Sequence, residues 1–235
     1  MIGMVDSMLK DILVKHYSIE LRTGMHIGGG QEKVGIGGAD SPVITVEIRW
    51  KDRDYEVPYI PGSSIKGRMR SLLELKYFSK GDFDNLKDPD MVSCKANLNG
   101  KKKLIGEAFG CPRGDNSHQM DFVYTRFSFS DFFLSEDTMN ELVKREQGYY
   151  RLGTEIKAEN SINRGTGRAN PRFIERAVPQ LRFEGTIGIN VFEGDKEEDL
   201  IELLKEGIDL LEKSYLGGSG SRGYGRIHVE EIQGR

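Results

Sequence analysis

The sequence predicts an α+β domain in which helices cover one face of an antiparallel sheet, the ferredoxin-like arrangement. Three observations predict it: apolar residues that alternate with polar ones in several segments, two strongly amphipathic helical segments, and the order β–α–β, a second β-rich stretch, then β–α–β. The second face of such a sheet is free for a ligand, as in RNA-recognition domains. We expect one domain over residues 1–235, because this length is enough to bury a sizeable core.

Three strands and one helix are expected in the first part of the chain. The strands alternate apolar and polar residues at Tyr17–Leu21, Ile44–Trp50 and Tyr55–Tyr59, the last two joined as a hairpin. The helix follows Pro61-Gly62, with Ser63 or Ser64 as its N-cap. The polar segment Ser79–Lys103 has no sustained periodicity, so we expect a mobile insertion that contributes little to the core.

The rest of the chain continues the pattern, with an excursion in the middle. The expected strands are Val123–Phe129, Thr154–Glu159, Leu181–Val191 and a last one around Ile227 and Val229, and the expected helical segments are Leu104–Gly110, Thr138–Gln147 and Leu200–Leu211. The segment Asn160–Gln180 is rich in Arg, Asn and Gly, so we expect it to leave the core.

Charge is segregated along the chain although its total is nearly balanced. The 34 Lys and Arg residues against 37 Asp and Glu residues give a net charge of -3, which does not announce nucleic-acid binding. Phosphate contacts depend on local clusters of Lys and Arg instead. Between Leu152 and Arg182 the chain carries Lys157, Arg164, Arg168, Arg172, Arg176 and Arg182, while acidic residues crowd Glu193–Asp199. The basic segment is therefore a candidate contact for nucleic acid.

Cysteine usage and hydropathy indicate the compartment. Cys94 and Cys111 do not make a disulfide framework, and a chain of this size does not require one. No run of about 18 apolar residues predicts a transmembrane helix, and Met1–Lys10 lacks the features of a secretory signal. We expect a cytoplasmic protein with no membrane partner.

Glycine is bunched in two loops. Its 29 residues exceed the average usage of roughly 7%. In Leu216–Arg226 three glycines fit G-x-G-x-x-G, but the loop follows a helix and enters a strand, which excludes the dinucleotide fingerprint. We expect a loop with exposed amides, Arg222 for a phosphate and Tyr224 for base stacking. A glycine-rich helix stop is the alternative.

Two more segments carry candidate ligand contacts. The glycine loop Gly24–Gly30 contains one histidine, His26, for which a buried structural role is the alternative. The predicted helix after Gly62 places hydroxyls and amides at its N-terminus, with Lys66, Arg68 and Arg70 close behind. Helix starts bind anions through unpaired N–H groups and the helix dipole. An ordinary capped helix with a solvated basic face is the alternative there.

Several ordered motifs together resemble the RAMP superfamily of CRISPR proteins. They are Thr23–Gly29, Ile60–Gly67, Arg126–Asp131, Lys157–Arg172 and the glycine-rich C-terminal loop Leu216–Arg226. The likeness runs almost from end to end, breaks mainly at Ser79–Lys103, and is strongest to the repeating backbone subunit of the type III-A effector. It implies a ferredoxin-like (RRM-like) palm, a lid inserted over residues 79–120, and a thumb β-hairpin over residues 154–182 that kinks the guide–target duplex. Asn163 stands where the family often has Asp.

The resemblance implies guide (crRNA) binding, complementary target RNA, and polymerisation with other copies of the chain. Further expected partners are a large polymerase-like subunit, a small helical subunit and a RAMP subunit that caps the 5′ end of the guide. The candidate RNA-binding residues are His26, Gly28, Gly29, Ser63, Ser64, Lys66, Arg68, Arg70, Lys157, Asn160, Arg164, Arg172, Gly218, Ser219, Gly220, Ser221, Arg222 and Tyr224.

The resemblance also implies cleavage of the target RNA. Ile36–Val43 matches the motif of the family's catalytic aspartate, which places that role on Asp40. A carboxylate beside the scissile phosphate can hold a divalent cation, expected to be Mg²⁺, or orient the attacking 2′-hydroxyl. Without the resemblance, a cap on the turn before Ser41-Pro42 is the favoured role of Asp40.

Two other function classes stay open. A purely structural guide-binding RAMP subunit would not need Asp40. A standalone guide-processing endonuclease is disfavoured, because such enzymes carry two ferredoxin-like repeats and this chain shows one. Some relatives carry a Cys/His cluster just before the position of Phe109-Gly110. Cys94, Cys111 and His118 lie nearby but lack a C-x-x-C pair and a clear fourth ligand, so we do not expect a structural zinc.

Overall fold

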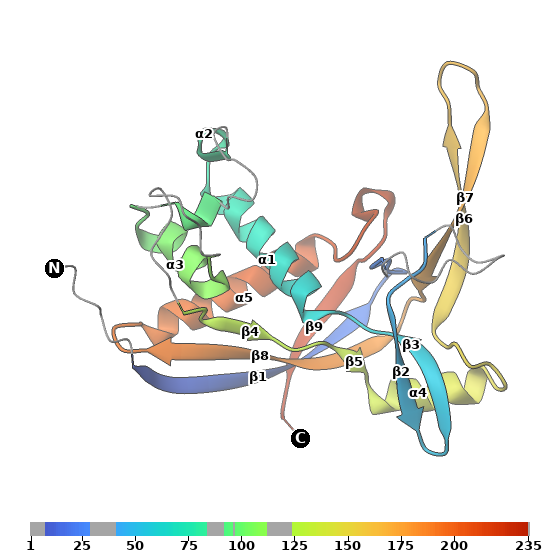
Figure 1. Cartoon of the computed structure of the whole chain (residues 1–235), viewed down its shortest axis with the longest axis horizontal. Helices are drawn as coiled ribbons and strands as arrows, with labels where there is room; N and C mark the ends of the chain where they lie inside the picture. Colours follow the sequence, from blue (N-terminus) through green and yellow to red (C-terminus); the bar gives the residue numbers. More distant parts are fainter. Residues whose placement is uncertain (1–7, 29–40, 84–91, 96, 112–123, 235) are drawn as a thin grey trace.

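The computed structural model describes residues 8–28, 41–83, 92–95, 97–111 and 124–234. Its centre is an antiparallel sheet in the order β4-β8-β1-β9, with β5 also paired to β8 (Figure 1). These strands are β1 (Leu9–Leu21), β4 (Phe127–Phe129), β5 (Phe133–Leu134), β8 (Arg182–Phe192) and β9 (Ile227–Ile232). The mixed α/β class and the antiparallel sheet predicted from the sequence are confirmed.

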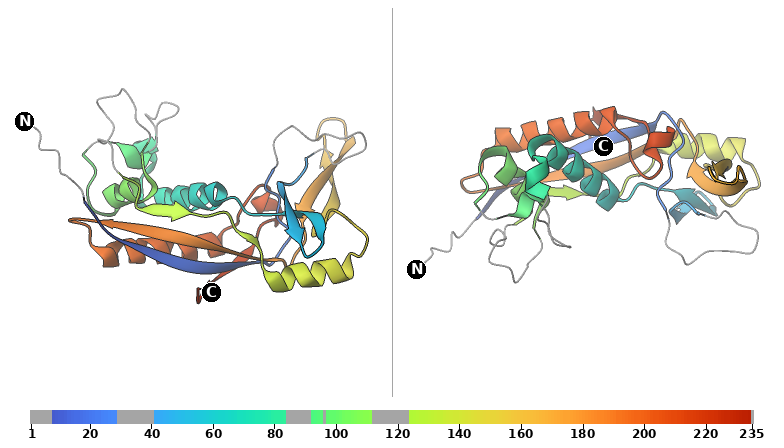
Figure 2. Two further views of the ribbon diagram at one scale, coloured as in Figure 1. Left: turned by 60° about the horizontal axis from the view of Figure 1, so that its bottom comes forward. Right: turned by 90° about the horizontal axis from the view of Figure 1, so that it is seen from above.

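Three helices pack on one face of this sheet (Figures 1 and 2). They are α1 (Gly62–Tyr77), α3 (Gly100–Phe109) and α5 (Glu197–Lys213). The register pairs Tyr17 with Gly185 and Ile19 with Phe183, so alternate residues of β1 and β8 join the buried core. Helices α1 and α5 approach closely at Gly207, where a Cβ would lie 2.6 Å from Met69 Cγ. The opposite face carries more polar and exposed residues.

Two hairpins and a short helix lie beyond one end of this sheet. The first hairpin joins β2 (Thr45–Trp50) to β3 (Arg53–Pro58) through a two-residue turn in which Lys51 has φ 54°. The second joins β6 (Thr154–Ile162) to β7 (Ala169–Ala177) and projects away from the rest of the molecule (Figure 1). Helix α4 (Glu136–Arg145) begins after Ser135, whose Oγ accepts a hydrogen bond from the Thr138 N–H.

The start of α1 differs from the sequence prediction. Its N-cap is Pro61, so Ser63 and Ser64 lie inside the first turn and neither is the cap. The amide of Gly62 donates to Asp131 Oδ1 at 2.8 Å, which satisfies one of the unpaired N–H groups at the helix start. An Asp side chain from another part of the chain thus takes the place that we expected a local serine to fill.

The prediction that Ser79–Lys103 contributes little to the core is wrong in the residues that the structure describes. After the short helix α2 (Lys80–Phe83), the turn η2 (Val92–Cys94) is buried, with Val92 and Cys94 at most 1% exposed. Cys94 is joined to Cys111 by a disulfide, which the sequence did not predict. This turn therefore belongs to the core, because it packs beside α1 and is bonded to the residue that follows α3 and Gly110.

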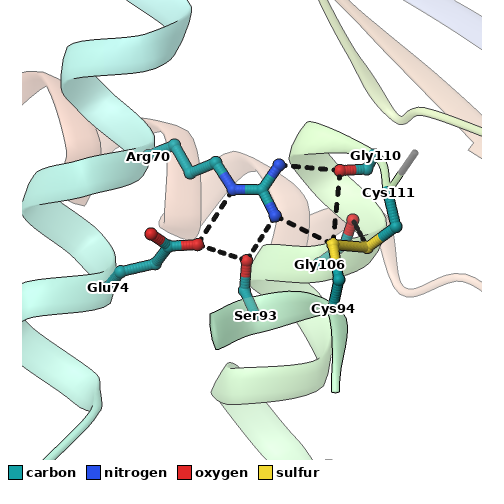
Figure 3. Close-up of a disulfide and its surroundings, with 7 residues drawn as sticks. All are labelled: Arg70, Glu74, Ser93, Cys94, Gly106, Gly110 and Cys111. Atoms are coloured by element: carbon teal, nitrogen blue, oxygen red, sulfur yellow. Dashed lines mark hydrogen bonds and ion pairs between the residues drawn. A yellow bond between two sulfur atoms is a disulfide. The ribbon is translucent and has the colours of Figure 1, made fainter. Parts of the chain in front are cut away.

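A buried arginine organises the same region (Figure 3). Arg70 of α1 donates to Glu74 Oε1 at 2.9 Å, to the Gly110 carbonyl at 2.8 Å and to Ser93 Oγ at 2.6 Å, and it reaches Cys94 Sγ at 3.0 Å. One guanidinium thus connects α1, η2 and the end of α3.

No helix in the described part of the chain is both long enough and apolar enough to cross a membrane.

Candidate RNA-binding groove

A groove of ≈ 470 Å³ lies against the β6–β7 hairpin. We call it the hairpin groove, and its lining residues are Lys157, Glu159, Asn160, Ile162, Arg172 and Arg222. Four of these are sequence-predicted RNA contacts: two from β6, one from β7, and Arg222 from the loop that follows α5. Residues 50 to 65 positions apart in sequence are thus brought together. Three cationic side chains and one amide can bind successive phosphates and riboses of an RNA backbone.

Tyr224 anchors the loop 216–226 to this hairpin, a role different from the predicted stacking. Its side chain is buried at 0% exposure, so its ring offers no surface to a base. Its hydroxyl donates to Glu159 Oε1 at 2.7 Å, and the cations of Lys157 and Arg176 lie 4.7 Å and 5.0 Å from the ring centroid. The prediction that Tyr224 stacks on a base is therefore wrong.

Glu159 is the acidic member of the groove. Besides the Tyr224 hydroxyl, it accepts a hydrogen bond from Arg222 Nη1 at 3.1 Å. The hydrogen bond from Tyr224, followed by that from Arg222, lowers the pKa of the Glu159 carboxyl against the opposing effect of burial. Burial and the Glu159 carboxylate raise the pKa of Tyr224 to about 12. Glu159 is therefore ionised at neutral pH and holds Arg222 at the groove.

The two glycine loops pack against each other, which accounts for several of their glycines. The Gly218 amide donates to the His26 carbonyl at 2.8 Å, and the Gly225 amide donates to the Gly24 carbonyl at 3.0 Å. Gly217 has φ 81°, and a Cβ there would lie 2.5 Å from the His26 carbonyl oxygen. Much of the glycine signal thus reflects close contact between two backbone segments.

The predicted residues of these loops differ in accessibility. Gly28, Gly218, Ser221 and Arg222 are exposed and Ser219 is half-buried, whereas Gly220 is buried in the 3₁₀ turn η3 (Gly220–Arg222). Gly220 packs so tightly on the Tyr215 ring that a Cβ would collide with it. Gly220 is therefore a packing residue rather than an exposed RNA contact. Gly29 lies outside the described residues.

His26 occupies a hydrogen-bonded position between the glycine loop and β7. Its Nδ1 lies 2.7 Å from the Glu175 carbonyl and must donate there, so Nε2 accepts from Ser41 Oγ at 3.1 Å in the neutral ring. Asp40, the predicted catalytic residue, lies outside the described residues. The next residue, Ser41, forms a bridge with Ile174, and its carbonyl accepts from the Glu175 amide. The segment that follows Asp40 is thus attached to β7 beside His26.

Glu175 and Arg151 hold this segment and had no signal in the sequence. The buried Glu175 carboxylate accepts from the Val43 amide at 3.1 Å and pairs with Arg151 at 2.8 Å. Both stand in charged stretches with no periodic pattern, so nothing local separates them from surface residues.

The cations of α1 have three different environments. Arg70 is buried in the network described above, so its prediction as an RNA contact is wrong. Arg68 is half-buried: it donates to the Tyr215 carbonyl and to Ser214 Oγ, and lies 4.1 Å from the Tyr215 ring centroid. Burial, followed by the charge of Arg70, lowers the pKa of Lys66. Within the described residues Lys66 has no ion pair, Ser63 is exposed and Ser64 is half-buried. These three side chains therefore stay available as RNA contacts.

Arg164 lies in the turn at the far end of the hairpin and is not among the residues that line the hairpin groove. The turn there is held by Asn163, whose Oδ1 accepts from the Gly165 and Thr166 amides at 2.9 Å and 3.1 Å. An aspartate carboxylate could accept the same two bonds, so this turn is compatible with either Asn or Asp.

The described residues contain no group of three or more His, Cys, Asp or Glu side chains that could hold a metal ion. Both cysteine sulfurs are bonded to each other, so neither is a free zinc ligand, and His118 lies outside the described residues.

The comparison with protein families matches residues 18–228 to the model of the RAMP superfamily. The chain belongs to this superfamily. Within it, the chain is 39% identical over 219 residues to the "CRISPR system Cms endoribonuclease Csm3" of Streptococcus thermophilus, covering 92% of this chain and 86% of that protein. It is 36% identical to the protein of the same name from Methanocaldococcus jannaschii over 231 residues, covering 96% and 81%.

Solved structures share the fold at lower identity. The alignment with a chain of the type III-B Cmr-beta complex bound to cognate target RNA has a TM-score of 0.56 and 17% identity, and covers 94% of this chain and 61% of that one. This chain thus spans less than two thirds of that neighbour's length. A chain of a type IV-B CRISPR complex gives a TM-score of 0.53 at 14% identity, covering 95% and 93%. These two similarities support the fold.

Proposed function

We propose that this protein is a guide (crRNA)-binding backbone subunit of a type III-A CRISPR ribonucleoprotein, and that it cleaves complementary target RNA at regular intervals. The observation that carries the proposal is the hairpin groove, where Lys157, Asn160, Arg172 and Arg222 converge. Relatives named Csm3 endoribonucleases, 36% to 39% identical over more than nine tenths of this chain, support it.

In this proposal each part of the fold has a role in the assembly. The central sheet with α1 and α5 is the ferredoxin-like palm, residues 79–120 are the lid, and residues 154–182 are the thumb that kinks the guide–target duplex. Copies of the chain polymerise along the guide in the cytoplasm. The complex also contains a large polymerase-like subunit, a small helical subunit and a RAMP subunit that caps the guide's 5′ end.

The chain recognises the RNA backbone rather than its bases. Arg172, Arg222 and Lys157 are phosphate donors, and the described part of the groove presents no free aromatic ring or base-reading pair. When a phosphate binds Arg222, it takes over the donor that Glu159 holds in the free protein. Affinity should therefore vary little with spacer sequence and fall as salt rises.

Cleavage in this proposal depends on Asp40. Its carboxylate orients the 2′-hydroxyl beside the scissile phosphate. The 2′-hydroxyl gives its proton to solvent water as the 2′-oxygen bonds to phosphorus, and the bond to the 5′-oxygen breaks while that oxygen takes up a proton from water. A divalent cation, expected to be Mg²⁺, can stabilise the phosphate charge. The described residues do not supply a ligand cluster for it, so chelation is the test of this part of the proposal.

The test compares complexes reconstituted with wild-type or Asp40→Ala subunit, given labelled complementary RNA and magnesium. Asp209→Ala, which removes an exposed carboxylate on α5, is the matched control. We expect Asp40→Ala to abolish cutting while guide and target binding persist, and EDTA to stop the wild-type complex. Equal cutting by both complexes would leave Asp40 as a turn residue. Binding without any cutting by the wild type would identify a non-catalytic structural subunit.

A further inference from the structure

A second groove, of ≈ 650 Å³, lies between the β2–β3 turn and the C-terminal end of α4. We call it the β2–α4 groove. Its cationic lining is Lys51 from the turn, Arg53 from the start of β3 and Lys144 from the helix. Tyr55 and Val143 add apolar surface. The two hairpins point in opposite directions in Figure 1, so this groove is separate from the hairpin groove.

The three cations of the β2–α4 groove are available to an anionic ligand. All three are exposed, and none has an ion-pair partner within the part of the chain that the structure describes. The one carboxylate that lines the groove, Glu146, is already bound by Arg145 Nη2 at 3.0 Å and by the Gly153 amide at 3.1 Å. The groove therefore carries an excess of positive charge in a chain whose net charge is -3.

Exposed aromatic rings follow the groove directly along the chain. Gly148 lines the groove, and the next two residues are Tyr149 and Tyr150, which are 70% and 49% exposed. The Tyr150 hydroxyl donates to Glu47 Oε2 at 2.6 Å, which fixes that side chain, while Tyr149 is the more accessible ring. Unpaired bases stack on such rings, and an acidic protein segment would gain little from them. Cations beside exposed tyrosines therefore favour single-stranded RNA over an acidic peptide.

We propose that the β2–α4 groove is a second RNA-binding site, which takes an unpaired stretch of RNA. The phosphates contact Lys51, Arg53 and Lys144, and a base stacks on Tyr149. This inference rests on the proposed function in one respect, namely that the chain binds RNA. It adds a surface that none of the sequence motifs marks.

The test measures binding of a fluorescein-labelled single-stranded RNA of unstructured sequence to the full chain by fluorescence anisotropy at several salt concentrations. The test variant is Lys51→Gln/Arg53→Gln/Lys144→Gln. The matched control is Lys10→Gln/Lys196→Gln/Lys205→Gln, which removes the same charge from exposed lysines outside both grooves. Tyr149→Ala tests the stacking, and Arg172→Gln/Arg222→Gln tests the hairpin groove in parallel.

We expect the test variant to bind about tenfold more weakly or worse, and the slope of log affinity against log salt to fall by about 2, because each lost phosphate contact removes about 0.7. The lysine control should change far less, and Tyr149→Ala should weaken binding at high salt as well as at low salt. If the test variant matches the lysine control while Arg172→Gln/Arg222→Gln loses affinity, this inference falls and the proposed function stands. Labelled polyglutamate serves as a second probe. A test variant that loses polyglutamate binding but keeps RNA binding would identify an acidic protein ligand instead and overturn this inference. A wild-type chain that binds no RNA would overturn both.

Discussion

Replacing Arg70 by Ala should destabilise the protein strongly and leave its RNA contacts intact. Arg70 is 8% exposed, and its guanidinium donates to Glu74, to the Gly110 carbonyl and to Ser93 at once. Without it the Glu74 carboxylate, only 14% exposed, loses its cation. Removing one partner of a buried ion pair costs about 3–5 kcal/mol. For a chain of this size, where about 1 kcal/mol shifts the Tm by about 2–4 °C, the Tm should fall by about 6–20 °C.

The assay is thermal unfolding of the purified chain, with RNA affinity measured in parallel below the transition. Arg49→Ala is the matched control, because Arg49 pairs with Asp54 on the surface at 64% and 46% exposure and should cost at most about 1 kcal/mol. The double variant Arg70→Ala/Glu74→Ala should recover part of the loss, since it removes the unpaired charge. A Tm as high as that of Arg49→Ala, together with weaker RNA binding, would refute the structural role and restore Arg70 as an RNA contact.

Two further predictions concern the packing of the helices. Burial raises the pKa of the Glu206 carboxyl on α5, but hydrogen bonds from Lys76, Tyr77 and Lys101 outweigh it and lower this pKa to about 2. The ionised carboxylate therefore stabilises the fold above its ordinary pKa of 4.5. This stabilisation is lost as the pH falls toward 2. The difference in Tm between wild type and Glu206→Gln should therefore narrow between pH 7 and pH 3, and a constant difference would contradict this. Replacing Cys94 and Cys111 together by Ser removes a disulfide between positions 17 residues apart, which should lower the free energy of unfolding by about 3 kcal/mol. Urea unfolding under non-reducing conditions measures this difference. An unchanged free energy of unfolding would show that the disulfide does not stabilise the fold.

The strands and helices that contribute most to the core were predictable from the sequence. Alternation over Leu181–Val191 predicted β8, and the apolar spacing of Leu200–Leu211 predicted α5, because one face of each is buried and the other is not. The first half of β1 was missed. Ile12 and Val14 are about half exposed there, so apolar residues occur on both faces and hide the period of two. No alternation marked strand β7, because much of it is exposed, and the hairpin that contains it was expected only from the family resemblance.

The sequence predicted which residues take part in the candidate site better than it predicted which of them are exposed. Lys157, Arg172 and Arg222 converge as the basic segment and the glycine loop suggested. The sequence could not tell which side of the chain a Tyr or Arg faces, so the buried Tyr224 and Arg70 were taken for ligand contacts. Their burial depends on segments far away along the chain, Glu159 in one case and the turn at Ser93 in the other.

The β6–β7 hairpin can be lengthened without disturbing its base. Its far end is closed locally by Asn163, whereas Tyr224 and Arg176 bind the part of the hairpin nearer the central sheet through Glu159 and Glu155. Because side chains alternate with a period of two, only additions of two residues per strand keep every existing side chain on its own face. Each such addition would move the tip outward by about 6.6 Å. The hairpin is therefore a structure whose reach can change in fixed steps of two residues per strand.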